Sequence, residues 1–366
     1  MRWDAQRLDA EEPATLPGMP SMRGLLRSVQ VPEFPGLTFH EVRSKSALNE
    51  VPGDSAVPFR WTVNPYRGCS HSCVYCFARG THQWLELDTG EDFDTQVVVK
   101  TNLVDVLRRE LARPSWRREH VALGTNTDPY QRAEGRYRLM PGVIGALAAS
   151  GTPLSVLTKG TLLRRDLPLL AGAARDVPIG LGVSLAVWDD ALHASLEPGV
   201  PGPRARLELV RAIADAGLSC GVFLAPVLPG LTDRLADLDA ALGAIAEAGA
   251  TGVTVVPLHL RPGAREWFSA WLAREHPQLV PRYQQLYRRG AVVAPEYRTW
   301  LEQRVGPLLA RYGLDRQAGG AARGADGTPA GIPGDADRAF PAGSLPVTRP
   351  AVRPVVEPAG EQLSLL

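Results

Sequence analysis

Apolar and polar positions along the chain follow two different periods, and segments of the two kinds alternate. Short apolar runs that are typical of buried strands occur near residues 60, 121, 154, 179, 219 and 252. Between them, apolar positions lie three and four residues apart, which indicates amphipathic helices. The clearest stripe, within residues 233–248, consists of Leu235, Leu238, Leu242 and Ile245. The pattern therefore predicts six successive βα units.

Six such units predict an α/β fold with a parallel sheet, because short buried strands that alternate with helices pair in parallel. Right-handed crossovers curve such a sheet into a barrel or an open part of one. Six units are two short of the eight that close a TIM barrel. We therefore expect a partial (βα)6 TIM-like barrel, whose side opening admits a bulky substrate.

The segments that flank the barrel differ from it in character. Residues 1–58 carry many prolines and no sustained period, so we predict a loosely structured N-terminal extension before a barrel at residues 59–260. Residues 261–314 form a helical C-terminal segment rich in aromatic residues, for which packing on the outside of the barrel is favoured over a base-stacking platform. The last segment, 315–366, is predicted to be a disordered tail, since residues 316–360 include eight Gly, seven Pro and ten Ala.

Composition and charge narrow the class of protein. Hydrophobic residues make up 45% and charged residues 22%, which is typical of a soluble globular protein. The formal net charge is +1, so attraction to nucleic acid must come from a local patch. No run approaches the roughly 18 apolar residues of a membrane span, and the N-terminus lacks the apolar core of a signal peptide. We expect a cytoplasmic protein without a membrane partner.

The cysteines suggest a metal centre. The chain has four cysteines, and three of them, Cys69, Cys73 and Cys76, have the spacing C-x3-C-x2-C. Three thiolates can hold three corners of a [4Fe-4S] cluster and leave the fourth iron open. The alternative is zinc, with His71 or Cys220 as the fourth ligand, although structural zinc usually takes its ligands from two separated pairs. Spacing favours the cluster.

Residues 64–79, NPYRGCSHSCVYCFAR, resemble the cysteine loop of the radical S-adenosylmethionine superfamily, which follows the first strand of a partial (βα)6 barrel. The resemblance implies a [4Fe-4S] cluster that binds S-adenosylmethionine at its open iron. One electron, from a donor of the flavodoxin or ferredoxin type, then yields a 5′-deoxyadenosyl radical that abstracts a substrate hydrogen. It also implies that Tyr75 packs near the adenine.

Further segments resemble the branch related to spore photoproduct lyase, often described as DNA repair photolyase-like: TNTDPYQRAE, LTKGTLLRRDLPLL, LEPGVPGPRARLELV and APVLPGLTD. The resemblance covers about residues 60–310. It implies that S-adenosylmethionine is bound at strand ends by Thr125, Asn126, Thr127, Asp128, Lys159 and Ser184. It also includes Glu197 and Arg206, for which an ion pair that shapes the pocket is at least as well supported as direct contact.

One departure from this branch concerns the hydrogen donor. Spore photoproduct lyase has an additional cysteine near the end of its second strand, where this chain has residues 124–128, GTNTD. Cys220 lies on the fifth predicted strand, and we interpret it as a buried thiol that packs as a small hydrophobe. A different donor is then required, and Tyr130 and Tyr66 are the candidates.

The chain ends in a short peptide that resembles the motif by which bacterial DNA polymerases and repair enzymes bind the sliding clamp. The peptide consists of Gln362, Leu363, Ser364, Leu365 and Leu366. Leucines that fill a groove and a glutamine amide suit such an interaction, and a chance apolar terminus is the alternative. The expected function is therefore a lyase-type radical reaction on nucleic acid, plausibly DNA repair. The alternatives are modification of a peptide, RNA or metabolite, and a non-catalytic iron–sulfur or zinc adaptor.

Overall fold

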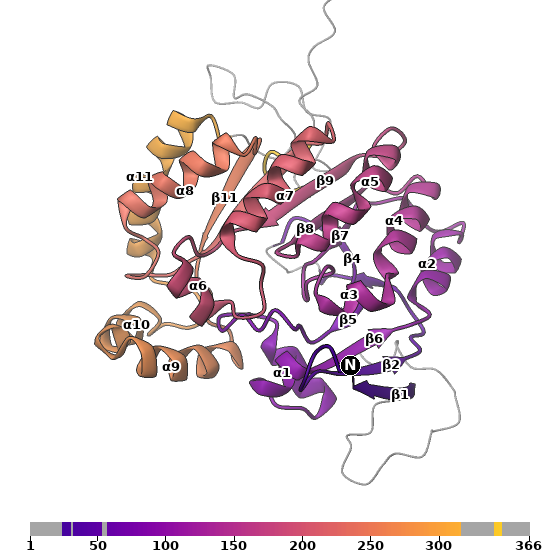
Figure 1. Ribbon diagram of the computed structural model, residues 1–366, viewed down its shortest axis with the longest axis horizontal. Helices are drawn as coiled ribbons and strands as arrows, with labels where there is room; N and C mark the ends of the chain where they lie inside the picture. Colours follow the sequence, from indigo (N-terminus) through magenta and orange to yellow (C-terminus); the bar gives the residue numbers. More distant parts are fainter. Residues whose placement is uncertain (1–23, 31, 53–56, 316–339, 346–366) are drawn as a thin grey trace, which may run out of the picture.

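The six predicted strands all form, and they lie side by side in one sheet of the computed structural model, which describes residues 24–30, 32–52, 57–315 and 340–345. They are β4 (Trp61–Val63), β7 (Val121–Leu123), β8 (Leu154–Thr158), β9 (Ile179–Ser184), β10 (Cys220–Val227) and β11 (Gly252–Pro257). Their order is β11-β10-β9-β8-β7-β4, and every neighbouring pair is parallel. Strand β3 (Leu48–Glu50) adds an antiparallel edge beside β4. The architecture is the partial barrel that the sequence predicts (Figure 1).

Helices connect the strands and cover the outer face of the sheet (Figure 1). The longer connections are α2 (Leu103–Leu111), α4 (Leu139–Ala149), α5 (Leu167–Ala173) after the 3-10 helix η3 (Thr161–Asp166), α7 (Pro203–Asp215) and α8 (Leu235–Glu247). Shorter helices sit in the loops: η2 (Arg79–Leu85), α1 (Glu91–Thr95), α3 (Arg132–Tyr137) and α6 (Asp190–Leu196). In α8 the predicted stripe is correct except at its first member, because Leu235 is 46% exposed.

The prediction of a loosely structured N-terminal extension is wrong for much of residues 24–52. Strands β1 (Leu25–Gln30) and β2 (Thr38–Val42) join β6 (Gln96–Lys100) and β5 (Tyr66–Arg67) in a second sheet of order β1-β2-β6-β5. Its core includes Phe39, Tyr66 and Val97. Strand β2 pairs with β6, which follows the cysteine loop in the sequence. The strand therefore forms because of a partner distant in sequence, and no apolar–polar period within residues 24–52 predicts it.

The C-terminal helices pack on the outside of the barrel, as predicted. They are α9 (Ala264–Glu275), η4 (Pro277–Leu279), α10 (Val280–Leu286) and α11 (Pro295–Tyr312). Helix α11 lies beside α8, where the Tyr312 hydroxyl bonds to Asp239 at 2.9 Å. The rings of Phe268, Trp271 and Tyr283 are buried. These aromatic residues therefore serve packing more than they form an open stacking platform.

The prediction of a disordered tail over residues 315–366 is wrong for residues 340–345, in which Phe340, Ser344 and Leu345 are buried against the sheet. The clamp-like peptide at residues 362–366 lies outside the described residues. Within the described ranges, no helix combines the length and apolar character needed to cross a membrane.

Candidate functional site

The cysteine loop lies between β5 and η2, beyond the C-terminal end of β4. Cys69 and Cys73 are each 6% exposed, and Cys76 is half-buried. Two consecutive turns shape the loop: the Ser72 amide donates to the Cys69 carbonyl, and the Cys76 amide donates to the Cys73 carbonyl, both at 3.1 Å. Gly68 starts the loop with φ +79°, and a Cβ there would lie 2.6 Å from the Gln96 carbonyl oxygen. Only glycine fits at that position.

Gln131 holds the start of this loop, and the sequence does not predict it. The side chain is fully buried, and its amide makes two bonds to the loop backbone. Oε1 accepts from the Ser70 amide at 3.0 Å, and Nε2 donates to the Gly68 carbonyl at 2.9 Å. The only signal is its place in the TDPYQ segment, because its partners are backbone atoms about sixty residues away.

Arg79, also absent from the sequence predictions, holds the middle of the loop. Its fully buried guanidinium donates to the Cys73 carbonyl at 3.0 and 3.2 Å and to both carboxylate oxygens of Asp94 at 2.9 and 3.0 Å. The group lies between the rings of Phe93 and Trp267, 5.2 and 5.0 Å from their centroids. It therefore ties the cysteine loop to α1 and α9.

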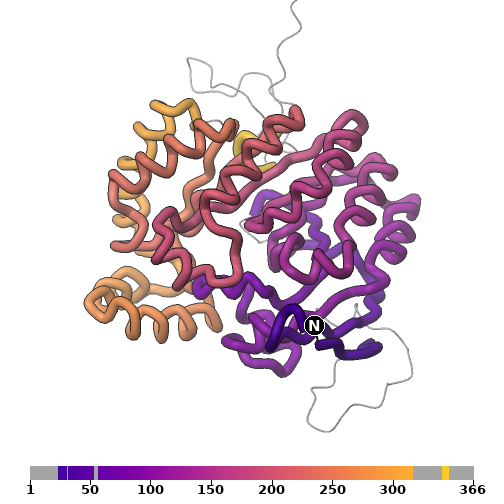
Figure 2. The backbone as a smooth tube through the Cα atoms, in the orientation of Figure 1, coloured from indigo at the N-terminus to yellow at the C-terminus, as the bar shows by residue number. Residues whose placement is uncertain are grey.

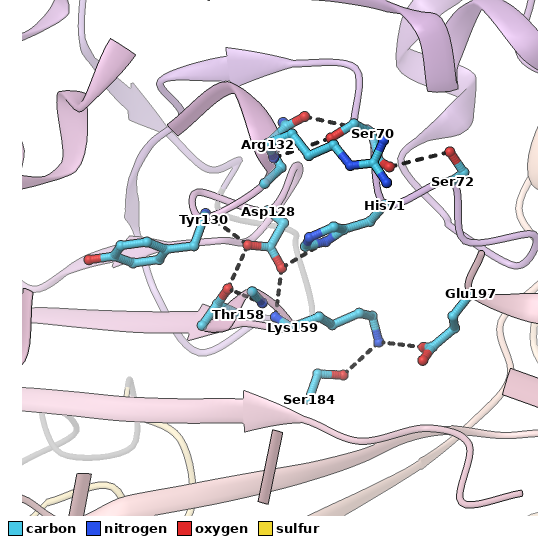
Figure 3. A network of polar contacts seen from close by, with 12 residues as sticks. Ser70, His71, Ser72, Asp128, Tyr130, Arg132, Thr158, Lys159, Ser184 and Glu197 are labelled. Atoms are coloured by element: carbon cyan, nitrogen blue, oxygen red, sulfur yellow. Dashed lines mark hydrogen bonds and ion pairs between the residues drawn. The ribbon is translucent and has the colours of Figure 1, made fainter. Parts of the chain in front are cut away.

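Asp128 joins the cysteine loop to the ends of β7 and β8 (Figure 3). One oxygen accepts from the Thr158 hydroxyl at 2.6 Å and the Tyr130 amide at 2.9 Å. The other accepts from the Lys159 amide at 2.6 Å and lies 3.3 Å from His71 Nδ1. Burial alone would raise the pKa of Asp128, but His71 and these donors hold it below its usual value. Asp128 is thus occupied by protein groups, which fits a positioning role better than the expected contact with S-adenosylmethionine.

The structure brings Tyr75, Lys159, Ser184, Glu197 and Arg206 together, as expected for one pocket. Lys159 Nζ lies 2.8 Å from Ser184 Oγ, 3.1 Å from Glu197 Oε1 and 3.1 Å from the Tyr75 hydroxyl, which donates to Glu197. Arg206 bonds Glu197 at 2.7 Å and the Ser184 carbonyl at 2.9 Å. We call these five residues the Lys159 group (Figure 3 shows three of them).

The Lys159 group contains two cations, Lys159 and Arg206, and one carboxylate, Glu197. Glu197 and Arg206 are fully buried, whereas the Lys159 side chain is 15% exposed. Burial opposes ionisation of Glu197, but Arg206 and Lys159 outweigh it and lower the pKa of Glu197. One positive charge is therefore in excess, and it sits on the side chain that solvent and ligands can reach.

The remaining strand-end residues behave differently from one another. The Thr127 hydroxyl donates to the Tyr66 carbonyl at 2.8 Å and is buried, so it supports the loop. Thr125 and Asn126 are half-buried at the end of β7. Among the described residues their side chains make no hydrogen bond, so both remain available to a ligand.

Tyr66 and Tyr130 are both buried, and carboxylates engage their hydroxyls. Tyr66 donates to Glu134 at 2.5 Å, and Tyr130 donates to Asp166 at 3.1 Å. Burial and these carboxylates raise the pKa of both phenols. The Tyr130 ring points away from Lys159 in Figure 3. The geometry therefore does not bring either hydroxyl to the Lys159 group.

A recess of about 340 Å³ opens beside the cysteine loop. It is lined by His71, Tyr130, Arg132, residues 160–162 and residues 198–201. These segments follow β7, β8 and α6, so the recess lies at the C-terminal end of the barrel, where such barrels place their sites. Its volume suits a small ligand or one unit of a larger substrate.

The cysteines fit an iron–sulfur cluster better than one zinc ion. In the part of the chain that the structure describes, no three His, Cys, Asp or Glu side chains surround a position for a single metal ion. Cys220 is the first residue of β10, at the opposite end of the barrel from the cysteine loop, and is fully buried, as predicted for a packing thiol. Burial raises the pKa of Cys73 and raises that of Cys76 to about 11. Thiols so hard to ionise need the positive charge of a bound metal to act as ligands.

The parallel partial barrel and the three-cysteine loop at its C-terminal end together define a radical S-adenosylmethionine protein. A family model described as the Radical SAM superfamily matches residues 63–241. The chain belongs to this superfamily, so its cofactors are a [4Fe-4S] cluster and S-adenosylmethionine, and it needs a reductant.

The chain is also similar to proteins of known sequence and to solved structures. An uncharacterized protein of Mycobacterium tuberculosis (strain H37Rv) is 64% identical over 318 residues, 86% of this chain and 93% of its own. One of Methanocaldococcus jannaschii is 24% identical over 195 residues, 53% of this chain and 69% of its own. Among solved structures, a mutant spore photoproduct lyase with bound AdoMet and dinucleoside spore photoproduct has a TM-score of 0.56 at 16% identity and covers 74% of this chain and 78% of its own. That likeness shows the fold.

Proposed function

We propose that the protein is a radical S-adenosylmethionine enzyme that acts on DNA in a lyase-type repair reaction. The observation that carries the enzymatic part is the placement of the cysteine loop beside the Lys159 group. Asp128 links the two directly, since it lies 3.3 Å from His71 and accepts from the Lys159 amide. A loop for the cluster and a positively charged pocket for the cosubstrate thus share one anchor.

In this proposal Cys69, Cys73 and Cys76 hold three irons of the cluster. When bound, the cluster and S-adenosylmethionine supply a 5′-deoxyadenosyl radical that removes a hydrogen atom from the substrate. Arg79 and Gln131 keep the loop backbone in place for the three thiols. Their contacts are made by fully buried side chains, so solvent does not compete for them.

The Lys159 group would bind the polar end of S-adenosylmethionine. The excess charge on Lys159 attracts a carboxylate. The Ser184 hydroxyl accepts from Lys159 Nζ at 2.8 Å and donates to the Ala225 carbonyl at 3.3 Å, and it would turn from that carbonyl to donate to the same ligand. Thr125 and Asn126 would supply further hydrogen bonds from β7. Glu197 and Arg206 act through Lys159, because each is fully buried and the two are paired with each other at 2.7 Å. Tyr75 belongs with them, since its hydroxyl contacts both Glu197 and Lys159.

The DNA part of the proposal rests on the shared fold of spore photoproduct lyase, structures of which contain a dinucleoside spore photoproduct. Residues 124–128 correspond to the strand end where spore photoproduct lyase has its additional cysteine, and they contain no cysteine. The final hydrogen donor would therefore differ here, and the carboxylates that engage the hydroxyls of Tyr66 and Tyr130 disfavour these two phenols in that role. A reductant of the flavodoxin or ferredoxin type and a cytoplasmic location complete the proposal.

Substrate class can be tested by following 5′-deoxyadenosine. Reconstituted enzyme, dithionite and S-adenosylmethionine would be incubated with ultraviolet-irradiated DNA, untreated DNA, RNA or a peptide mixture. We expect irradiated DNA to raise the yield of 5′-deoxyadenosine and to change the mass of a nucleoside. Stimulation by RNA or peptide alone would reassign the substrate.

The clamp-like peptide is tested separately. Deletion of residues 362–366 should abolish binding to a purified sliding clamp while the yield of 5′-deoxyadenosine stays unchanged.

A further inference from the structure

Residues 340–345 occupy the N-terminal end of the barrel. Phe340 is 5% exposed, Ser344 is fully buried, and Leu345 is 8% exposed. The Phe340 ring lies against the His120 ring, with centroids 4.2 Å apart, just before β7 begins. In Figure 2 this yellow segment lies far from the purple cysteine loop. A short piece of the tail therefore crosses the end of the sheet that the functional site does not use.

Three glycines on neighbouring strands make room for this segment. They stand at the N-terminal starts of β9, β10 and β11: Gly180, Gly221 and Gly252. A Cβ at these positions would lie 2.6 Å from a Phe340 ring carbon, 2.2 Å from the Ala342 carbonyl oxygen and 2.9 Å from Gly343 Cα. At each position the three nearest atoms within 4 Å all belong to residues 340–344. Glycine weakens a strand interior, so this row of glycines has its physical reason in the tail.

The segment is complementary to the strands in return. Gly343 has φ +71°, and a Cβ there would lie 2.4 Å from the Gly252 amide nitrogen, so backbone meets backbone on both sides. The Thr251 hydroxyl donates to the Gly343 carbonyl. The Ser344 amide donates to the Pro341 carbonyl at 3.0 Å, which closes a turn within the segment. Shape and hydrogen bonding therefore select this peptide.

We propose that the N-terminal end of the barrel is a peptide-binding seat, that its occupant is the chain's own residues 340–345, and that the seat fixes where the chain's C-terminal end leaves the enzyme. Strands β8 and β9 end at Thr158 and Ser184 in the functional site, whereas Gly180, Gly221 and Gly252 start theirs at the seat. The described part of the chain therefore ends, at Leu345, on the face opposite the cysteine loop. At 3.3–3.6 Å per residue, the 21 residues that follow could span about 70–75 Å at most.

Hydrogen–deuterium exchange on the full chain tests the seat with a matched pair of substitutions. Gly221→Ala places a methyl group against the Ala342 carbonyl, whereas Gly145→Ala in α4 meets nothing within 4 Å. We expect the amides of this segment, above all the hydrogen-bonded amide of Ser344, to be protected in the unchanged protein and in Gly145→Ala. They should exchange at least about tenfold faster in Gly221→Ala and in Phe340→Ala, which leaves the strands intact. Absent protection in the unchanged protein, or protection retained in both test variants, would overturn the seat.

Energy transfer tests the direction in which the tail leaves. A donor dye on the last residue would be combined with an acceptor at Asp176→Cys or Asp189→Cys, two exposed positions that flank the start and the end of β9. We expect stronger transfer to position 176 than to position 189, and loss of this difference in Phe340→Ala. Equal transfer in the unchanged protein would contradict the proposal. Neither experiment depends on the reaction that the enzyme catalyses.

Discussion

At the scale of single residues, buried polar side chains hold the cysteine loop through its backbone. Gln131 binds its first carbonyl and amide groups, Arg79 binds the Cys73 carbonyl, and Asp128 reaches it through His71. Each side chain comes from, or bonds to, a segment distant in sequence. The cluster loop is therefore positioned by the folded barrel and not by its own short turns alone.

Arg79→Met should destabilise the protein strongly. The change removes the cation that pairs with Asp94, whose pKa burial already raises to about 6 despite Arg79. Loss of one partner of a buried ion pair typically costs about 3–5 kcal/mol, which urea unfolding can measure. The double variant Arg79→Met/Asp94→Asn should recover part of that loss. A loss below about 1 kcal/mol would show that the pair contributes little.

Gln131→Ala tests whether Gln131 holds the backbone of the cysteine loop, with Gln83→Ala as its control. Gln131 is fully buried, whereas Gln83 is an exposed glutamine of η2. Leaving the Gly68 carbonyl and the Ser70 amide without partners should lower the free energy of unfolding by about 1–3 kcal/mol per buried group and lower the iron retained after reconstitution. The control should stay within about 0.5 kcal/mol. Equal effects in both variants would contradict the positioning role.

How much of the site can be predicted from sequence depends on where the partners lie. The three cysteines, Lys159 and Glu197 carry their chemistry in the side chain, so spacing points to the cysteines and the family resemblance points to Lys159 and Glu197. Arg79 and Gln131 act on backbone atoms of other segments, and no local pattern reports such contacts. The sequence predicts that Asp128 binds the cosubstrate. A polar residue at a strand end gives no sign in the sequence that hydrogen-bond donors of the protein already occupy its carboxylate.

At the scale of elements, the six barrel strands and their helices follow from local patterns, and the second sheet does not. The apolar runs of β7 to β11 are buried by adjacent helices, so each strand can be predicted from its own sequence. Strands β2 and β6 belong to segments on either side of the cysteine loop and pair in parallel. Helix α8 shows the limit of periodicity, since Leu235 fits the stripe but is 46% exposed at the first turn.

Two leucines of α8 provide a matched test of burial. Leu238 is 2% exposed and Leu235 is 46% exposed, although both fit the same apolar stripe. Leu238→Ala should lower the free energy of unfolding by about 2–5 kcal/mol, because it leaves a cavity in the core. Leu235→Ala should change it by about 0.5 kcal/mol or less. Similar losses at the two positions would contradict the orientation of α8.

At the scale of the whole molecule, the candidate functional site and the seat for the tail lie at opposite ends of the parallel sheet. The C-terminal ends of its strands carry the cysteine loop and the Lys159 group, while the N-terminal ends carry the seat for residues 340–345. The tail's composition predicts disorder, and composition cannot report the glycine row, whose members lie on three different strands. Order in this tail segment is therefore a property of the assembled barrel.

Acid should destabilise the protein through His120 at the seat. Burial lowers the pKa of His120 to about 4, below its ordinary value of 6.5. Between these values the unfolded chain binds a proton that the folded protein does not, so stability falls as pH drops from about 6.5 to about 4. His120→Gln should flatten this dependence in urea unfolding measured across that window. An unchanged slope would show that other groups dominate it.

The central claim is most directly tested by iron content and cosubstrate cleavage after anaerobic reconstitution. The unchanged protein and Cys220→Ser should each bind about four iron per chain and form 5′-deoxyadenosine from S-adenosylmethionine with dithionite. Cys73→Ser should lose most of the iron and all of the cleavage. A colourless zinc protein without cleavage, or a Cys73→Ser variant that behaves like the unchanged protein, would contradict the account.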